Sequence, residues 1–401
     1  MQQTIPPTNR INSIDALRGF ALFGILLVHC MEQFDVMYSP ELSSPFWQKI
    51  DTILSRTIYF LFAGKSYAIF SLLFGLSFFM QMDSQAQKGV DFRWRFLWRL
   101  ALLFVLGYIN GMIYMGEFFL VYAILGIFLI PLFKVPTKWL IPIAIVLFLQ
   151  IPDIYNFSSA LSGGEASKSS LLVYMDSLYA EMGELFLTGS LSEVLHYNLW
   201  KGQLAKLLWV VNETRYPQLI GLFALGLIIG RCGIHKSEEK MVSYSKKALP
   251  YSIAFFALNY AIVIILPHLG FENTALSAGT TLFENYANLG MMLMYISGFM
   301  LLYYKTKAVK AMNYIAPVGR MSVTNYMTQS LIGVPLFYGF GLNLALQLSF
   351  LQCLSVGLII YALQLIFSNL WIKHYYFGPI EWLWRTATWF KTFPLKRSSH
   401  N

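Results

Sequence analysis

Hydrophobic residues in this chain form long, nearly continuous runs that are separated by short polar segments. A membrane-spanning helix needs roughly 20 consecutive apolar residues, whereas a membrane barrel shows alternating segments of about 10 residues. Runs of the first kind occupy residues 16–36, 64–81, 97–114, 117–133, 139–155, 214–231, 250–267, 285–304, 323–342 and 347–371. We therefore predict an all-α, polytopic helical membrane protein with about 10 transmembrane helices.

The runs are grouped in a way that predicts one membrane domain over residues 1–401. A first core block covers about 10–155, and a C-terminal block covers about 214–390. Between them lies an acidic segment, 156–213, that contains Ser and Gly and resumes helical periodicity around 171–191. We expect this segment to be an extracytoplasmic loop, either a cap over an outward-facing site or an ordinary connection. A shorter loop, 37–63, holds an amphipathic stretch over 47–62.

Charged residues make up only 12% of the chain, and the net charge of +9 has a topological explanation. With the N-terminus in the cytoplasm, 22 of the 29 Lys and Arg residues fall on the cytoplasmic side. Short loops rich in Lys and Arg stay in the cytoplasm, so both termini are predicted to be cytoplasmic. This asymmetry removes the need for a nucleic-acid partner. The three cysteines lack ligand spacing, which predicts neither a metal site nor a disulfide framework.

The first apolar run carries a polar stripe. Arg18 and His29 are eleven residues apart, about three helical turns and ~16 Å along the axis, so they share one helix face. Asp15 joins that face, and a continuing helix would add Glu32 and Gln33. Ionisable side chains inside a bilayer usually face a protein interior or a wet cavity.

Two interpretations of this stripe stay open. Asp15 and Arg18 fit an ordinary ion pair at a helix entry, with a histidine that hydrogen-bonds a neighbouring helix. Alternatively, a neutral imidazole at this depth is a candidate general base.

Four further segments hold notable polar residues. The sequence NGMIYMGE ends in Glu117, which is either a helix-start carboxylate or a partner of His29, and it begins with Asn110. Lys65 opens the second span, where it either binds substrate or snorkels outward. Asn325 and Gln329 are four residues apart on one helix face and suit either interhelical hydrogen bonding or a substrate contact. Near the C-terminus, Glu381 and Arg385 lie on a predicted amphipathic helix at the cytoplasmic surface.

Four sequence blocks carry a resemblance to a known family. They are residues 10–11 with 14–27 (IDALRGFALFGILL), 64–75 (GKSYAIFSLLFG), 319–326 (GRMSVTNY) and 377–385 (FGPIEWLWR). The chain resembles the DUF418 family of bacterial membrane proteins, often called YeiB-like. Asp15, Arg18 and His29 also look like the opening of the acyltransferase-3 family, a distant relative of DUF418.

The resemblance implies a function in the bacterial cytoplasmic membrane. It implies an acyl-CoA co-substrate that enters from the cytoplasm, no metal, and a small-molecule, glycan or lipid acceptor approached from the other face. On this analogy Arg18 contacts the donor's phosphates, and Arg320 is a second candidate for that contact. His29 is the catalytic base or acyl relay, Asp15 holds Arg18, and Glu117 orients the imidazole or the acceptor.

Two other functions stay open. A small-solute transporter would use Asp15, Arg18, His29 and Glu117 as a proton or ion path, with Asn285 and Asn288 along it. A non-catalytic membrane protein would use the same groups only for packing. No small-residue motif in the sequence is strong enough to predict an oligomer interface.

Overall fold

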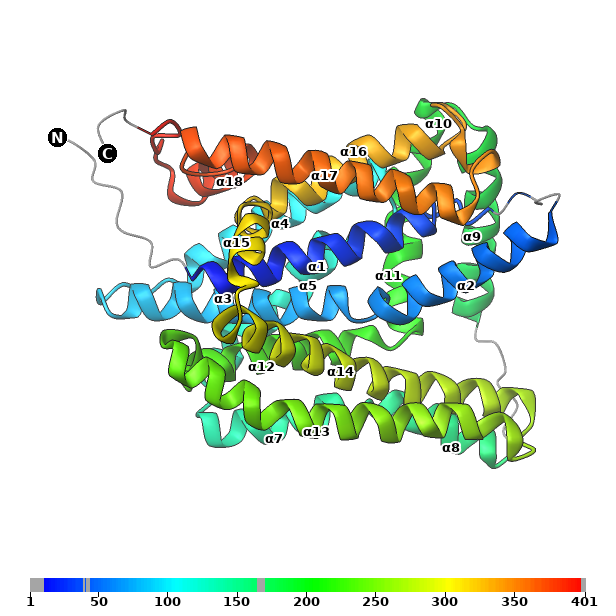
Figure 1. The fold of residues 1–401 in the computed structure, drawn as a ribbon, viewed down its shortest axis with the longest axis horizontal. Helices are drawn as coiled ribbons and strands as arrows, with labels where there is room; N and C mark the ends of the chain where they lie inside the picture. The colour runs from blue at the N-terminus through cyan, green and yellow to red at the C-terminus, as the bar shows by residue number, and fades with distance from the viewer. Residues whose placement is uncertain (1–10, 39, 41–43, 164–169, 398–401) are drawn as a thin grey trace.

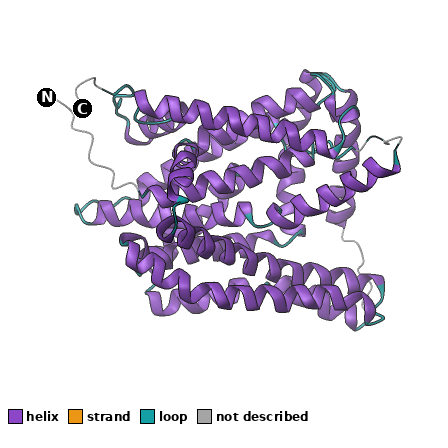
Figure 2. Ribbon diagram, in the orientation of Figure 1, coloured by secondary structure: helices purple, strands orange, loops and turns teal. Residues whose placement is uncertain are grey.

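The computed structural model describes residues 11–38, 40, 44–163 and 170–397. In these residues helices are joined by loops and turns, and one isolated bridge links Tyr375 and Lys396 (Figure 2). The α-helices are α1 Asn12–Met31, α2 Pro45–Phe62, α3 Ser66–Ala86, α4 Arg93–Ile113, α5 Phe119–Leu125, α6 Leu129–Lys134, α7 Thr137–Phe148, α8 Ile151–Leu161, α9 Ser170–Thr188, α10 Leu191–Tyr197, α11 Gln203–Asn212, α12 Arg215–Arg231, α13 Glu238–Ile265, α14 Asn273–Lys305, α15 Val309–Arg320, α16 Ser322–Phe337, α17 Phe350–His374 and α18 Pro379–Trp389. Short 3₁₀ turns lie at Gly126–Phe128, Ile234–Lys236, Leu266–His268 and Leu344–Leu346, and a π-helical turn, η2, lies at Asn198–Gly202. The all-α prediction is confirmed.

Within the described residues, seven helical segments are long and apolar enough to cross a membrane. They are Asn12–Met31, Pro45–Ala86, Arg93–Ile113, Thr137–Leu161, Glu238–His268, Asn273–Lys305 and Phe350–His374. The other three predicted spans correspond to shorter helices, namely α5 with α6, α12 and α16. The polytopic helical membrane class is therefore supported, while the count of ten rests on helices that are short for a bilayer core of about 30 Å.

The long helices run roughly side by side, and shorter ones cross them at both ends (Figure 1). α1 lies centrally and contacts α2, α3, α14, α15, α16 and α17. At one end of the molecule, α9 and α11 run across the direction of the long helices; at the other end lie α15, α18 and the start of α1. The predicted loop 156–213 is thus largely helical in its described part, and the expected periodicity around 171–191 becomes α9.

Glycine allows several of these helices to approach closely. A Cβ atom on Gly75 of α3 would lie 2.2 Å from the carbonyl oxygen of Phe223 in α12. A Cβ atom on Gly319 of α15 would lie 1.9 Å from the carbonyl oxygen of Asp15 in α1. Small residues at crossings bring backbones into direct contact, which is a common device in membrane helix packing. The second crossing brings the end of α15 against the polar stripe of α1.

Candidate functional site

The cytoplasmic end predicted for the stripe contains a preorganised arginine. Arg18 donates one hydrogen bond to Asp15 (2.7 Å) and another to the hydroxyl of Ser77 in α3 (2.6 Å). Asp15 is buried, while the side chain of Arg18 keeps 21% of its surface exposed. The α1–α15 crossing places Arg320 next in sequence to Gly319, whose Cβ position is 2.9 Å from the Cβ of Arg18. The fold therefore brings Asp15, Arg18 and the backbone at Arg320 together.

His29 lies near the other end of α1 and is surrounded by aromatic rings. Its ring centroid is 5.0 Å from that of Tyr114, 5.7 Å from that of Phe34 and 6.2 Å from that of Tyr326. These three rings are buried, yet His29 itself stays partly exposed. Within the described residues no hydrogen bond involves the imidazole. The interpretation of His29 as a histidine satisfied by a neighbouring helix finds no partner in that part of the chain.

The polar stripe does not continue as a helix beyond Met31, so the prediction that Gln33 joins its face is wrong. Gln33, Phe34 and Asp35 all have positive φ values of 51°, 55° and 74°. Each such non-glycine residue costs roughly 1–2 kcal/mol and needs support from its surroundings. Gln33 instead turns to donate a hydrogen bond to the carbonyl oxygen of Ala345 (3.3 Å).

Tertiary contacts hold this left-handed turn in place. Tyr338 donates a hydrogen bond to the carbonyl oxygen of Phe34 (2.9 Å). The Phe34 ring packs where a Cβ atom on Gly333 would come within 2.0 Å of it. Strained backbone that is fixed from several sides is typical of functional sites. In this protein the turn directs Asp35 toward the loop after α4.

Glu32 and Asp35, in the link after α1, are two neighbouring acidic side chains that sequence analysis did not combine. Asp35 accepts a hydrogen bond from the backbone N–H of Gly116, and Glu32 is hydrogen-bonded to the phenol of Tyr59. Both remain partly exposed. Burial among protein atoms, together with the charge of Asp35, raises the pKa of Glu32 to about 8. Burial raises the pKa of Asp35 to about 6, although the Gly116 hydrogen bond and Lys206 oppose the shift.

Glu117 is fully buried and has two roles. Its carboxylate accepts hydrogen bonds from the backbone N–H groups of Phe119 and Leu120 (3.2 Å for the latter), so it caps the first turn of α5 as the helix-start interpretation predicts. It also forms an ion pair with Lys206 of α11, with Oε2 and Nζ 3.6 Å apart. Burial raises the pKa of Glu117 and lowers that of Lys206, and the pairing opposes both shifts. The described residues show no hydrogen bond between Glu117 and His29.

Lys206 is the residue of this site that sequence reasoning missed. The charge distribution predicts only a loop cation on the outer side at this position. In the structure Lys206 is 3% exposed and reaches the α4–α5 turn from α11. The available signal was its helical spacing from Gln203 and Val210, which are both buried on the same helix.

The remaining candidates divide between the site and the packing. Asn110 of α4 donates to the hydroxyl of Ser330 in α16 (3.3 Å), one helical turn before Tyr114. Asn325 donates to Ser368 (3.0 Å) and Gln329 donates to Gln364 (3.1 Å), which joins α16 to α17. For these last two the contacts favour interhelical hydrogen bonding.

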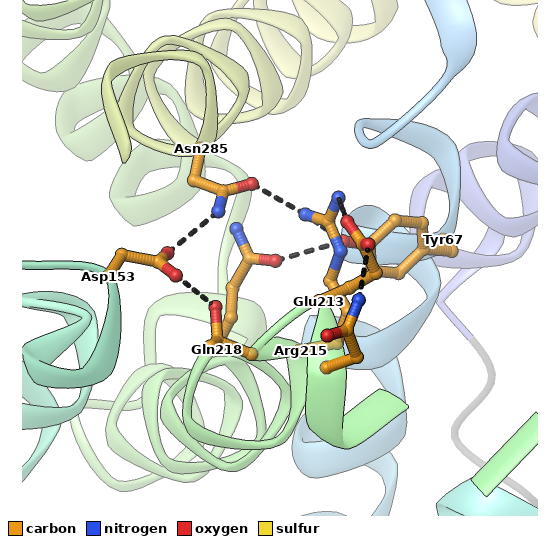
Figure 3. A network of polar contacts seen from close by, with 8 residues as sticks. Tyr67, Asp153, Glu213, Arg215, Gln218 and Asn285 are labelled. Carbon is orange, nitrogen blue, oxygen red and sulfur yellow. Dashed lines mark hydrogen bonds and ion pairs between the residues drawn. The ribbon is translucent and has the colours of Figure 1, made fainter. Parts of the chain in front are cut away.

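Lys65 and Asn285 lie in other surroundings. Lys65 is buried, with its ammonium 5.6 Å from the ring centroid of Phe60. Asn285 belongs to a separate polar network, in which Arg215 donates to its Oδ1 (2.6 Å) and its Nδ2 donates to Asp153 (2.9 Å) (Figure 3). A hollow of about 160 Å³ beside this network is lined by Asp153, Asn156, Asn212, Glu213, Ala278 and Thr281. The transporter hypothesis expects Asn285 to lie along one path with His29. The contacts of Asn285 are instead with Arg215 and Asp153.

One described protein family matches part of this chain. Residues 229–391 match the family described as "Protein of unknown function (DUF418)". The C-terminal part of this chain therefore matches the DUF418 family. The resemblance stated from the four sequence blocks is thereby confirmed.

Three relatives of this chain are distant in sequence but match it over nearly their whole length. It is 26% identical to the "Uncharacterized 39.9 kDa protein in amylase 3'region" of Bacillus acidopullulyticus, over 96% of both chains. It is 26% identical to the uncharacterized protein YxaH of Bacillus subtilis (strain 168), over 97% of both chains. It is also 26% identical to the uncharacterized protein YeiB of Escherichia coli (strain K12), over 94% of this chain and 95% of the relative.

Two of the sequence blocks meet inside the DUF418 region. Glu381 of α18 accepts hydrogen bonds from the backbone N–H groups of Val323 (2.7 Å) and Thr324 (3.0 Å) and from the hydroxyl of Thr324. These groups belong to the first turn of α16, where a helix leaves N–H groups without partners. The carboxylate of one block therefore caps the helix of the other, instead of serving only the predicted Glu381–Arg385 pair. The predicted C-terminal helix is present as α18, packed against α4 and α16.

Proposed function

We propose that this protein transfers an acyl group across the membrane, from an acyl-CoA donor to a nucleophilic acceptor. The observation that supports this most directly is the position of His29, whose imidazole lies among buried aromatic rings and has no hydrogen-bond partner among the described residues. A general base must be open to the proton that it removes, and a neutral histidine suits this task near pH 7.

The other end of α1 suits the donor. Arg18 is held by Asp15 and Ser77 yet keeps part of its guanidinium exposed. Guanidinium groups bind phosphate oxygens through charge-assisted hydrogen bonds. Arg18 and His29 lie on one continuous helix, about 16 Å apart along its axis. This separation favours a donor whose phosphates and thioester are joined by a long arm.

The chemistry requires one proton transfer and one substitution. His29 takes the proton of an acceptor hydroxyl or amine as that atom attacks the thioester carbonyl carbon. The carbon–sulfur bond breaks, and the coenzyme A thiolate receives a proton. Asp15 and Arg320 would help to bind the donor, while Glu117 would act by fixing the α4–α5 turn and Lys206.

The orientation that goes with this function has both termini in the cytoplasm, as the distribution of Lys and Arg predicts. The end with α15 and α18 then faces the cytoplasm and the donor. The end with α9 to α11 faces outward, toward the acceptor.

The test is acyl transfer by purified protein with a short-chain acyl-CoA. Replacing His29→Ala should lower turnover by about 10²–10⁴-fold, which is the usual contribution of a positioned general base. His29→Gln provides a second variant of similar size. His268→Ala is the matched control, because His268 is exposed in a turn after α13. A folded His29→Ala protein with wild-type turnover would exclude this base.

A proton-coupled transporter is the second candidate, and the buried Glu117–Lys206 pair beside Asp35 favours it. Solute flux in proteoliposomes without acyl-CoA, lost in Lys206→Met, would establish this function in place of acyl transfer.

A further inference from the structure

Several buried polar atoms without a hydrogen-bond partner gather between α4 and the α10–α11 segment. Among the described residues, they are Asn110 Oδ1, Asn198 Oδ1, Gln203 Oε1 and Nε2, and Asp35 Oδ2. A buried polar group without a partner costs about 1–3 kcal/mol, and folded proteins leave few of them. Such a concentration indicates that a polar molecule completes these groups.

Two glycines one turn apart on α4 make room for this arrangement. A Cβ atom on Gly107 would lie 3.0 Å from Glu117 Oε2, and one on Gly111 would lie 2.4 Å from Gln203 Nε2. Gln203 is 7% exposed, and Asn110, next in sequence to Gly111, is 1% exposed. The polar side chains of α11 are therefore packed directly onto the backbone of α4, one turn from Tyr114.

The charges at this place do not balance. Among the described residues, Asp35 and Glu117 interact with Lys206, and Glu32 interacts with Asp35, so three carboxyl groups accompany this lysine. Lys206 and Glu117 are sealed and paired with each other, while Glu32 and Asp35 remain partly exposed. The less buried part of the site therefore offers two acidic groups, of which Glu32 can release a proton, while Lys206 is engaged by Glu117.

We propose that Glu32 and Asp35 bind the ammonium group of a small amine, and that Gln203 and Asn110 hydrogen-bond its remaining polar atoms. The proposal rests on the proposed function in one respect: the amine-bearing ligand is then the acyl acceptor, held beside His29. Binding itself requires no acyl donor.

Proton exchange gives this site a specific signature. The pKa of Glu32 is raised to about 8, so its carboxyl group holds a proton through most of the neutral range. A bound ammonium stabilises the ionised carboxylate, and that proton leaves when the ligand binds. Between pH 6 and pH 8 the affinity for the amine should therefore rise with pH.

The experiment is isothermal titration calorimetry with ethanolamine at pH 7.5, on the full-length protein in detergent without acyl-CoA. Ethylene glycol serves as the neutral probe of similar size. We expect saturable binding of ethanolamine by the wild type, at least tenfold weaker binding in Glu32→Gln and Asp35→Asn, and no saturable heat with ethylene glycol. Titration in two buffers of different ionisation enthalpy should reveal proton release.

The control variant is Glu184→Gln, an exposed glutamate of α9 at the same end of the molecule, which should bind ethanolamine as the wild type does. His29→Ala should also retain binding, even where it loses acyl transfer. If the protein binds ethanolamine but acyl transfer does not depend on His29, only the proposed function is refuted. Absence of ethanolamine binding by the wild type, equal binding of ethylene glycol, or unchanged binding in both carboxylate variants would each overturn the amine site.

Discussion

Two of the polar networks among the described residues, that of Figure 3 and that around Lys206, differ in how many of their buried side-chain atoms have hydrogen-bond partners; in the first, Arg215 Nε lacks one. In the network of Figure 3, Asp153 accepts from Thr214 and Asn285, and Asn285 in turn accepts from Arg215. Around Lys206, in contrast, amide atoms of Asn110, Asn198 and Gln203 lack partners among the described residues. The first network joins α8, α12 and α14, as structural hydrogen bonds do. The second is incomplete, as a site that awaits a ligand must be.

This comparison shows that a buried ionisable group is not by itself a sign of function. Arg215 and Lys206 are both cations inside the fold, and each has a carboxylate nearby. Lys206 differs in its surroundings, because it is almost fully buried between Glu117 and Asp35 and lies next in the helix to the unpartnered amide of Gln203, whereas Glu213 beside Arg215 is one-third exposed. The environment of the cation therefore separates packing from chemistry.

The largest expected effect comes from breaking the network of Figure 3. Arg215→Met removes the charged donor to Asn285 Oδ1 and the cation beside Glu213, which leaves the buried amide oxygen of Asn285 without its partner. We expect a loss of about 3 kcal/mol of stability, measured as a lower Tm in detergent. Arg56→Met, at an exposed position of α2, is the control and should be neutral. An unchanged Tm for Arg215→Met would remove the structural role of this network.

A smaller effect is expected from pH at the incomplete site. Since the pKa of Glu32 is raised from 4.5 to about 8, the folded state holds more protons than the unfolded state between these values. Stability should therefore fall as pH rises from 5 to 8, by a few kcal/mol at most. Asp35 and Tyr59 are the titratable groups that act on Glu32, and the raised pKa of Asp35 acts in the same direction.

The variant Glu32→Gln isolates this contribution. It should flatten the dependence of Tm on pH between 5 and 8 relative to the wild type. Parallel curves for the two proteins would show that Glu32 titrates normally in the folded state.

The smallest effect is expected from Gln203→Met. Because neither polar atom of the Gln203 amide has a partner among the described residues, a side chain of similar size should preserve stability to within about 0.5 kcal/mol or raise it. Gln87→Met, on the exposed end of α3, is the matched control. A clear fall in Tm for Gln203→Met alone would mean that the amide is part of a complete structural network, as in Figure 3.

The sequence by itself determined the helical membrane class, the family and the place of the long helices. Apolar runs near 20 residues have few structural solutions in a bilayer, and helical spacing alone puts Arg18 and His29 on one face. The positions of Asp15, Arg18 and Glu117 at helix ends also followed from local rules, since caps and ion pairs depend on nearby residues.

Only the tertiary structure decided which polar residues meet. Lys206 reaches Glu117 across 89 positions of sequence, and Asp35 reaches Gly116 through a left-handed turn that Tyr338 and Gly333 hold in place. No periodicity predicts such contacts, because they depend on how helices cross and where glycine lets them approach. The same reason separates Asn285 from His29, although both lie in apolar spans that looked equivalent in the sequence.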